Sequence, residues 1–212
     1  MRVTLEVKRR THARLVEAVE SLVKARGFDS VTTRDVAAAA GVGHGTLFNY
    51  FSSREALGLA LCDVFLARAA ADAARTSRHG EGPAEDLFAL GAASLRRLRP
   101  LRDAAGTLLA GVLLIPEDAG ALDPDAPPGQ PLGVRRRFLD AVRSTAARHR
   151  PGHEPDAATL HLYASLFVGV VTSWSRDASP HQEDTLALLD QATRLFAAAL
   201  DDAPDRHEEE TP

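Results

Sequence analysis

The segment from Thr32 to Leu57, TTRDVAAAAGVGHGTLFNYFSSREAL, constrains the fold of this 212-residue chain more than any other. It predicts two short helices joined by a tight turn, with a third helix starting directly afterwards. Thr32 can cap the first helix, because its hydroxyl accepts a free backbone N–H and Asp35 can reach back with its carboxylate. Gly41 is expected to end that helix, since glycine adopts left-handed dihedral angles without steric cost. Two short helices crossing about a glycine turn make a helix-turn-helix, whose second helix can lie in the major groove of DNA.

The second predicted helix carries polar and aromatic side chains that are not favoured on an ordinary exposed helix. Each of them can contact a phosphate, a base edge or a thymine methyl group. These residues are His44, Thr46, Phe48, Asn49 and Tyr50. Gly43 and Gly45 would let the backbone approach a duplex. Arg54 stands at the N-terminus of the third helix, where a cation is unfavourable, so we expect it to reach a phosphate.

This segment resembles the DNA-binding core of the TetR family of bacterial transcriptional regulators. The resemblance is carried by the threonine-capped TTRDVA, the turn AAGV, the recognition segment GHGTLFNYF and the helix start SREAL. It covers the first third of the chain, and the remainder is similar only in length and helical character. The resemblance implies a palindromic double-stranded DNA operator, and it implies a small-molecule pocket in the body of the protein.

Three positions depart from the usual pattern of the family. Gly43 stands where serine is usual, which removes a helix cap, and Phe48 stands where tyrosine is common, which removes a phenol donor. Arg54 replaces lysine, so it keeps the charge and adds a planar fork. The residues and the resemblance together predict a DNA-binding set. It comprises Arg9, Arg10, Thr33, Arg34, Gly43, His44, Gly45, Thr46, Phe48, Asn49, Tyr50 and Arg54.

Ordinary helix packing is the alternative to DNA binding. A lone residue like His44 is more often a solvated histidine, and a lone residue like Phe48 is more often part of a core. The distribution of charge supports the DNA interpretation. Residues 1–60 hold nine Lys and Arg against six Asp and Glu, whereas residues 61–212 hold sixteen against twenty-three. A basic N-terminal module on an acidic body places a phosphate-facing surface at one end of the molecule.

The rest of the chain predicts an all-α protein with three parts. We expect a three-helix helix-turn-helix domain at residues 1–52, a helical ligand-binding and dimerisation domain at residues 53–200, and a disordered acidic tail at residues 201–212. Hydrophobic periodicity and breaks place the helices. The predicted helices run from Arg9 to Gly27, from Ser53 to about Ala74, and over residues 84–99, 101–115, 134–149, 156–176 and 183–200. Residues 1–8 are interpreted as an arm, and residues 75–83 and 116–133 as loops.

The last predicted helix has two apolar stripes. Leu186, Leu189, Thr193, Phe196, Ala197 and Leu200 form one stripe, and Leu188, Ala192, Leu195 and Ala199 form the other. Two stripes predict that the helix contacts its own body on one side and a second copy of the chain on the other, which gives a homodimer with a four-helix interface. The alternative is that both stripes lie inside one monomer.

No motif of a known catalytic or nucleotide-binding site is present, so we expect neither an enzyme nor a cofactor. The single cysteine, Cys62, excludes an internal disulfide and a cysteine-rich zinc site. His149, His153 and His161 are loosely spaced, and Asp123 and Asp125 lie in a predicted loop, so no metal site is expected. No signal peptide or membrane span is visible, which predicts a cytoplasmic protein that does not bind a membrane.

The apolar side chains of the body could line a ligand cavity. The candidates are Phe65, Phe88, Leu109, Leu113, Phe138, His161, Tyr163, Phe167 and Trp174. For any one of them, a place in the plain core is the alternative. Arg135 to Arg137 are expected on the outside, and without a charged anchor the ligand would be neutral and largely apolar.

The sequence therefore predicts a repressor that a small apolar ligand releases from its operator. A ligand in the body would tilt the long third helix near Phe65 and so change the spacing of the two recognition helices. The alternative is a dimeric DNA-binding regulator controlled by a protein partner, without a small-molecule inducer. A closed cavity would favour the first function, and a solid core with an exposed apolar groove would favour the second.

Overall fold

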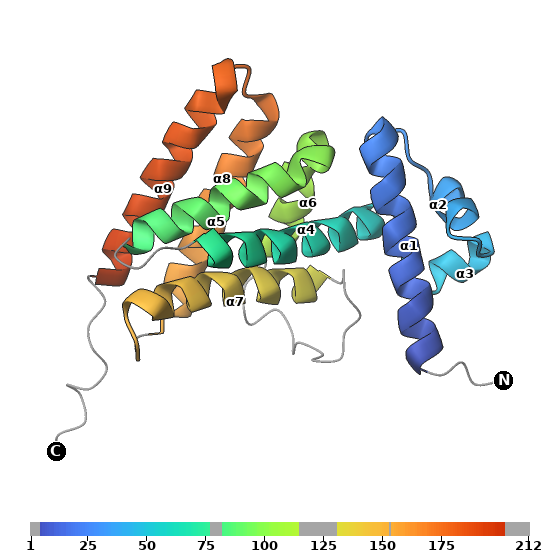
Figure 1. The fold of residues 1–212 in the computed structure, drawn as a ribbon, viewed down its shortest axis with the longest axis horizontal. Coiled ribbons are helices and arrows are strands. Elements are labelled where there is room, and N and C mark those ends of the chain that lie inside the picture. The colour runs from blue at the N-terminus through green and yellow to red at the C-terminus, as the bar shows by residue number, and fades with distance from the viewer. Residues whose placement is uncertain (1–4, 77–81, 115–130, 153, 202–212) are drawn as a thin grey trace.

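The computed structural model describes residues 5–76, 82–114, 131–152 and 154–201, and all regular structure within these ranges is helical (Figure 1). The predicted all-α class is confirmed. The helix-turn-helix module lies at one end of the molecule, and the pair of helices nearest the C-terminus lies at the other end.

The N-terminal module consists of α1 (Leu5–Arg26), α2 (Thr33–Ala39) and α3 (His44–Phe48). The predicted apolar stripe of α1 faces inward, with Leu15, Val19 and Val23 buried against the two short helices. Gly27 ends α1 with a left-handed φ of 78°. The start of α1 was predicted wrongly, because the helix begins at Leu5 and the expected arm is helical over residues 5–8.

The long helix α4 (Arg54–Thr76) connects this module to the body. It packs along α5 (Pro83–Leu98), which is followed by the short 3-10 helix η1 (Arg99–Leu101) and by α6 (Arg102–Leu113). The predicted break at Pro100 is confirmed, since proline removes a backbone donor and a new helix starts just beyond it.

Three further helices complete the body: α7 (Pro131–His149), α8 (Ala157–Arg176) and α9 (Glu183–Asp201), with the 3-10 helix η2 (Pro180–Gln182) before α9. By length and composition alone α8 could cross a membrane. In the fold it packs against α6 and α9, and its apolar side chains, among them Leu160, Phe167 and Val171, are buried there. The apolar character of α8 is therefore explained by its central position in the body.

Several predicted boundaries differ from the structure. Residues 75 and 76 and Pro83 are helical rather than loop, residues 131–133 belong to α7, and Asp201 belongs to α9 rather than to the tail. The remaining parts of the predicted arm, loops and tail lie outside the described residues, at positions 1–4, 77–81, 116–130 and 202–212. Asp123, Asp125 and His153 lie outside them as well.

Partly buried ion pairs join the helices of the body, and the sequence did not predict them. The guanidinium of Arg137 on α7 forms a two-point contact with the carboxylate of Asp63 on α4. On α5, Asp86 accepts from Arg148 at 3.1 Å and contacts the imidazole of His149 at 2.9 Å. The expected outward position of Arg135 to Arg137 is wrong for Arg135, which is buried, and for Arg137, which this ion pair holds against α4.

The turn between α8 and α9 depends on one carboxylate. Asp177 accepts hydrogen bonds from the backbone N–H of Ser179 at 2.8 Å and from its hydroxyl at 2.6 Å, and also from the N–H and hydroxyl of Thr185. These donors, with the Ser179 and Thr185 hydroxyls first, hold the pKa of Asp177 below its ordinary value of 3.8. The ionised carboxylate therefore fixes the start of α9 relative to the end of α8.

We predict that Asp177→Asn lowers the thermal stability at pH 7, because an amide nitrogen cannot accept these hydrogen bonds. Since the folded pKa is depressed, the stabilisation is present above pH 3.8 and is lost as the pH falls below that value. Thermal unfolding of parent and variant from pH 7 to pH 3 should therefore show a difference in melting temperature that begins to narrow below about pH 4. A constant difference across this range would contradict the role of the charge.

Candidate nucleic-acid interface and ligand region

The first helix of the helix-turn-helix starts at the predicted cap. The N–H of Asp35 donates to the Thr32 hydroxyl at 3.2 Å, and the N–H of Thr32 donates to the Asp35 carboxylate at 3.0 Å. Arg26, at the end of α1, forms an ion pair with the same carboxylate at 2.6 Å. These contacts fix the entry of α2 relative to α1.

The turn between α2 and α3 also follows the prediction. Gly41 has a left-handed φ of 62°, which an L side chain rarely adopts. The N–H of Val42 donates to the carbonyl of Ala37 at 3.0 Å, and the guanidinium of Arg14 donates to the carbonyl of Ala40. The end of α2 is thereby fastened to α1 as well, so the module presents α3 on a rigid support.

The recognition helix α3 is shorter than predicted and ends at Phe48, while Asn49 and Tyr50 lie in the turn that follows. Leu47 and Phe51 point inward and are buried, and the ring of Phe51 lies 4.9 Å from that of His12 on α1. The remaining predicted contacts face outward: Gly43, His44, Gly45, Thr46, Phe48 and Asn49 are exposed, and Tyr50 is half-buried.

His44, Phe48 and Thr33 form one connected surface. The Thr33 hydroxyl and Nε2 of His44 are 3.1 Å apart, which joins the start of α2 to the start of α3. The imidazole meets the edge of the Phe48 ring at a centroid distance of 4.9 Å. Phe48 remains 47% exposed although it is a large apolar side chain. An exposed aromatic ring held in this way is suited to an apolar contact with a thymine methyl group.

The structure gives Arg54 partners inside the protein. Its guanidinium carbon lies 5.1 Å from the centroid of the Phe28 ring, and its Nη1 donates to the carbonyl of Asp29 at 3.1 Å. Phe28 was absent from the predicted site, because nothing in the local pattern connects it with Arg54. The other predicted cations, Arg9, Arg10 and Arg34, are exposed on α1 and α2.

The predicted ligand-lining residues do not form one site. Phe138, Tyr163 and Phe167 lie together between α7 and α8, with the Phe138 and Phe167 rings 4.9 Å apart and the Phe138 and Tyr163 rings 6.0 Å apart. Leu109 and Leu113 on α6 are buried in the same core, whereas His161 on α8 is only half-buried.

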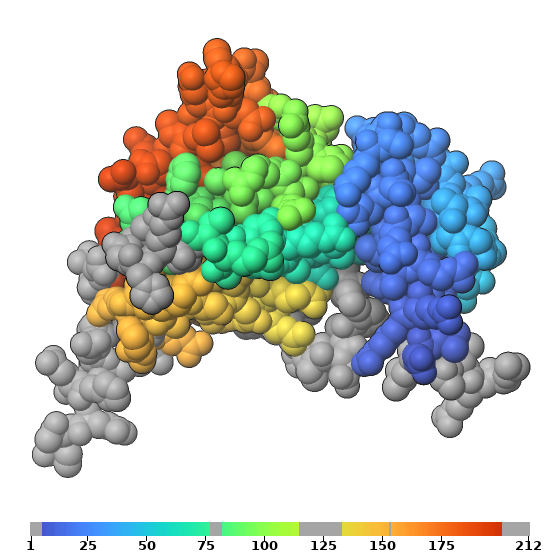
Figure 2. All heavy atoms as spheres, in the orientation of Figure 1, coloured from blue at the N-terminus to red at the C-terminus, as the bar shows by residue number. Residues whose placement is uncertain are grey.

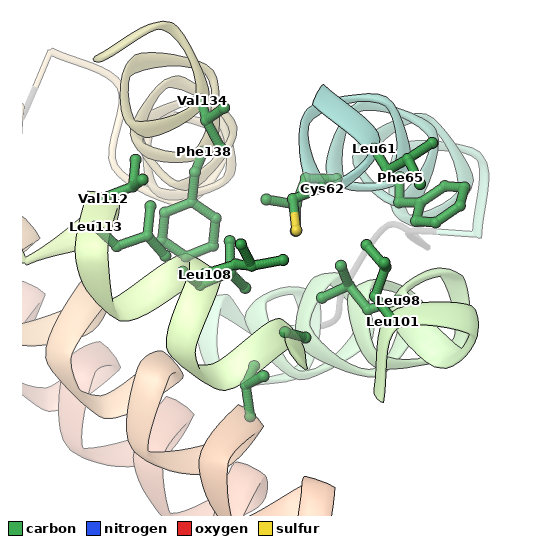
Figure 3. Packing of buried hydrophobic residues seen from close by; sticks show 14 of the residues in the cluster. Leu61, Cys62, Phe65, Leu98, Leu101, Leu108, Val112, Leu113, Val134 and Phe138 are labelled. Carbon is green, nitrogen blue, oxygen red and sulfur yellow. The ribbon is translucent and has the colours of Figure 1, made fainter. Parts of the chain in front are cut away.

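Three candidates lie elsewhere. Trp174 lies at the end of α8, where its indole N–H donates to Gln182 at 3.1 Å and the guanidinium of Arg102 packs over its ring. Phe65 points away from Phe138 (Figure 3). Phe88 contributes to a surface hollow of about 410 Å³ between the end of α4, the start of α5 and α9. The same hollow is lined by the charged side chains of Glu85, Asp190 and Arg194.

Between α4, α6 and α7 the structure places Cys62 and Leu108, which the sequence did not identify as ligand candidates, near the predicted candidate Phe138. Figure 3 shows Cys62 of α4, Leu108 of α6 and Phe138 of α7 on the facing sides of these helices, within the packed core. All three side chains are buried. Burial raises the pKa of the Cys62 thiol to about 12, so the residue is a small neutral core side chain, as predicted. Together these side chains form an apolar region of the core between α4, α6 and α7.

One stripe of α9 is buried and the other is largely exposed. Leu189, Phe196 and Leu200 pack inside the protomer. Leu188 and Leu195, spaced seven residues apart, are 40% and 63% exposed, and Leu162 on the adjacent α8 is 46% exposed. Ala192 and Leu186 differ from the prediction, since Ala192 is buried and Leu186 is exposed. Figure 2 shows α9 at the edge of the body, away from α1 to α3.

Among the described residues, no group of three or more His, Cys, Asp or Glu side chains could hold a metal ion.

Residues 15–61, from the middle of α1 into α4, match the family described as bacterial regulatory proteins, tetR family. The N-terminal module is therefore a DNA-binding domain of the TetR family of bacterial regulatory proteins. This match supports a general function in the regulation of transcription. No curated protein is significantly similar in sequence.

Solved structures of TetR-family proteins share the fold of the chain beyond the matched domain. A regulator from Rhodococcus sp. RHA1 is 23% identical, with a TM-score of 0.64 over 88% of this chain and 97% of that chain. FadR from Thermus thermophilus, a repressor solved in complex with lauroyl-CoA, is 23% identical, with a TM-score of 0.61 over 95% and 98%. AlkX from Dietzia sp. strain DQ12-45-1b, implicated in biodegradation of n-alkanes, is 23% identical, with a TM-score of 0.55 over 90% and 95%.

Proposed function

We propose that the protein is a cytoplasmic, homodimeric repressor that binds a palindromic operator and is released by a small apolar ligand. DNA binding is supported mainly by the exposed surface of α3. There Thr33 contacts His44, and His44 packs against the ring of Phe48. Residues 1–52 would bind DNA, and residues 53–200 would bind the ligand and the second copy.

In this arrangement α3 enters the major groove, so its exposed side chains meet base edges. Asn49, at the end of α3, can pair with an adenine edge through its amide. Arg54 and the exposed arginines of α1 and α2 would contact phosphates and set the register of the module on the duplex. Residues that contact bases and residues that contact phosphates should respond differently to mutation.

We predict that Asn49→Ala changes the sequence preference by about 1–3 kcal/mol at one base position, because it removes a base contact. Arg54→Gln should instead weaken binding to all sequences and lower the salt slope of the affinity by about 1. Binding to a panel of single-base operator variants at several salt concentrations separates the two effects. Arg96→Gln, which changes an exposed arginine on α5, is the matched control. Parental affinity and slope in Arg54→Gln would remove Arg54 from the interface.

The proposed dimer joins the exposed apolar face of α8 and α9 to its copy, with Leu162, Leu188 and Leu195 near the two-fold axis. An isologous contact of two helices from each copy would cover these leucines in a four-helix interface. Charges at Phe196 or Leu189 would not test this interface, because both side chains are buried inside the protomer.

We predict that Leu195→Glu converts the dimer to a folded monomer, since a carboxylate at the centre of an apolar interface would be buried without a partner. Sedimentation velocity gives the oligomeric state, and circular dichroism confirms the helical fold. Leu114→Glu, which alters another exposed leucine at the end of α6, should stay dimeric. An intact Leu195→Glu dimer would place the interface on another face.

The ligand part of the proposal rests on the apolar region between α4, α6 and α7, which continues into the aromatic cluster of α7 and α8. Its side chains, including Cys62, Leu108 and Phe138, offer hydrocarbon contacts. Two similar folds belong to FadR, which was solved in complex with lauroyl-CoA, and to AlkX, which is implicated in the biodegradation of n-alkanes. A long alkyl chain is therefore the first ligand class to test.

We predict that at least one of lauroyl-CoA, lauric acid and dodecane, which share a twelve-carbon chain, raises the melting temperature. A ligand at a hundred times its dissociation constant stabilises the folded state by about 2.7 kcal/mol. Phe138→Leu should reduce the shift, while Phe88→Leu, in the separate surface hollow, should not. The reverse pattern would place the ligand in the hollow. No shift with any probe would favour control by a protein partner.

A further inference from the structure

We propose that Phe28 is a positioning residue for Arg54, and that it transmits the position of α6 in the body to the DNA-facing surface. The inference rests on the proposed phosphate contact of Arg54 and deepens the proposed control of DNA binding. It identifies Phe28 as a residue that contacts neither DNA nor ligand but couples the binding of one to the binding of the other.

The first observation is the contact between Phe28 and Arg54. The guanidinium carbon lies 5.1 Å from the ring centroid, within the range of a cation–π interaction. The hydrogen bond from Arg54 to the carbonyl of Asp29, at 3.1 Å, fixes the guanidinium to the residue that follows Phe28. The loop between α1 and α2 therefore holds the charged group of Arg54 in one place.

The second observation is that α4 has no side chain at one buried position, Gly58. A Cβ atom on Gly58 would lie 2.8 Å from Cζ of Phe28 and 2.9 Å from Cδ1 of Leu108, which is too close for any real side chain. Gly58 and Arg54 are four residues apart and thus share one face of α4. Phe28 lies over this face with Arg54 packed on its ring, and Cδ1 of Leu108 on α6 approaches the same position of α4.

The third observation is burial. Phe28 is only 7% exposed, and it belongs to the same continuous core as Leu108. A close-packed core transmits displacement between neighbouring side chains. A shift of Leu108 toward α4 would therefore move the Phe28 ring, and the ring would carry the guanidinium with it.

This route differs from the tilt of α4 near Phe65 that the sequence suggested. Leu108 also borders the apolar region that contains Cys62 and Phe138 (Figure 3). A ligand in that region would displace Leu108, which lies close to the DNA-binding module. The signal would then reach the module without a tilt along the full length of α4. The relay is local, and it runs from Leu108 through Phe28 to Arg54.

The experiment measures DNA affinity and its salt slope for the full-length protein, on a duplex that the parent protein enriches from random sequence. Phe28→Leu keeps an apolar side chain beside Leu108 but removes the ring beneath Arg54. It should weaken binding several-fold and lower the salt slope by about 1, as expected for one lost phosphate contact. Combining it with Arg54→Gln should cause no further loss, because both changes remove the same contact.

Two more variants test the link to α6. Gly58→Ala should weaken DNA binding, because the added methyl group displaces the ring, and adding Leu108→Ala should restore binding by making room. This pair also decides the question if Phe28→Leu fails to fold, which the fluorescence of the single tryptophan, Trp174, would show. Failure of Leu108→Ala to restore binding would overturn the link to α6.

The outcomes separate this inference from the proposed function. Unchanged binding in Arg54→Gln would refute the proposed phosphate contact itself. Weaker binding in Arg54→Gln with a parental salt slope in Phe28→Leu would refute only the positioning role. Additive losses in the double variant would likewise show that Phe28 acts on the general stability of the module rather than through Arg54.

Discussion

The contact that the rest of the structure depends on is the close approach of Phe28 and Leu108 over Gly58. It exists because α4 lacks a side chain at one buried position. Through that position the core of the DNA-binding module continues into the core of the body, and both belong to one cluster of buried side chains. The ion pair between Glu20 on α1 and Arg68 on α4, at 2.6 Å, also joins the DNA-binding module to the long helix. A regulator built in this way can respond at one end to a change in packing at the other.

Features set by local sequence could be predicted. The capping pair Thr32 and Asp35, the left-handed Gly41 and the break at Pro100 each depend on residues within a few positions of one another, so the sequence contains the whole reason. The inward faces of α1 and α3 follow from helical periodicity, which places Leu15, Val19, Leu47 and Phe51 toward the interior. The helix-turn-helix and the all-α class could be predicted for the same reason.

Features set by contacts between distant residues could not be predicted. Arg137 looks like a surface residue in the sequence, but Asp63 lies 74 positions earlier and forms a partly buried ion pair with it. Phe28 and Leu108 are also far apart in the sequence, and only the fold shows that both approach Gly58. The predicted ligand candidates do not all lie together for the same reason, because periodicity identifies inward residues but not which of them face each other. Trp174 and Phe88 are inward or half-buried, yet they lie apart from the aromatic cluster.

The central claim is that the apolar region of the body and the DNA-facing surface are coupled. Thermodynamic linkage requires the coupling to be reciprocal, so DNA must weaken ligand binding by the same factor by which the ligand weakens DNA binding. The most direct measurement is a calorimetric titration of an alkyl-chain probe that binds, carried out on free protein and on protein saturated with operator DNA. The account predicts weaker binding to the DNA complex, by about 5–150-fold. Equal affinity in the two titrations would contradict it.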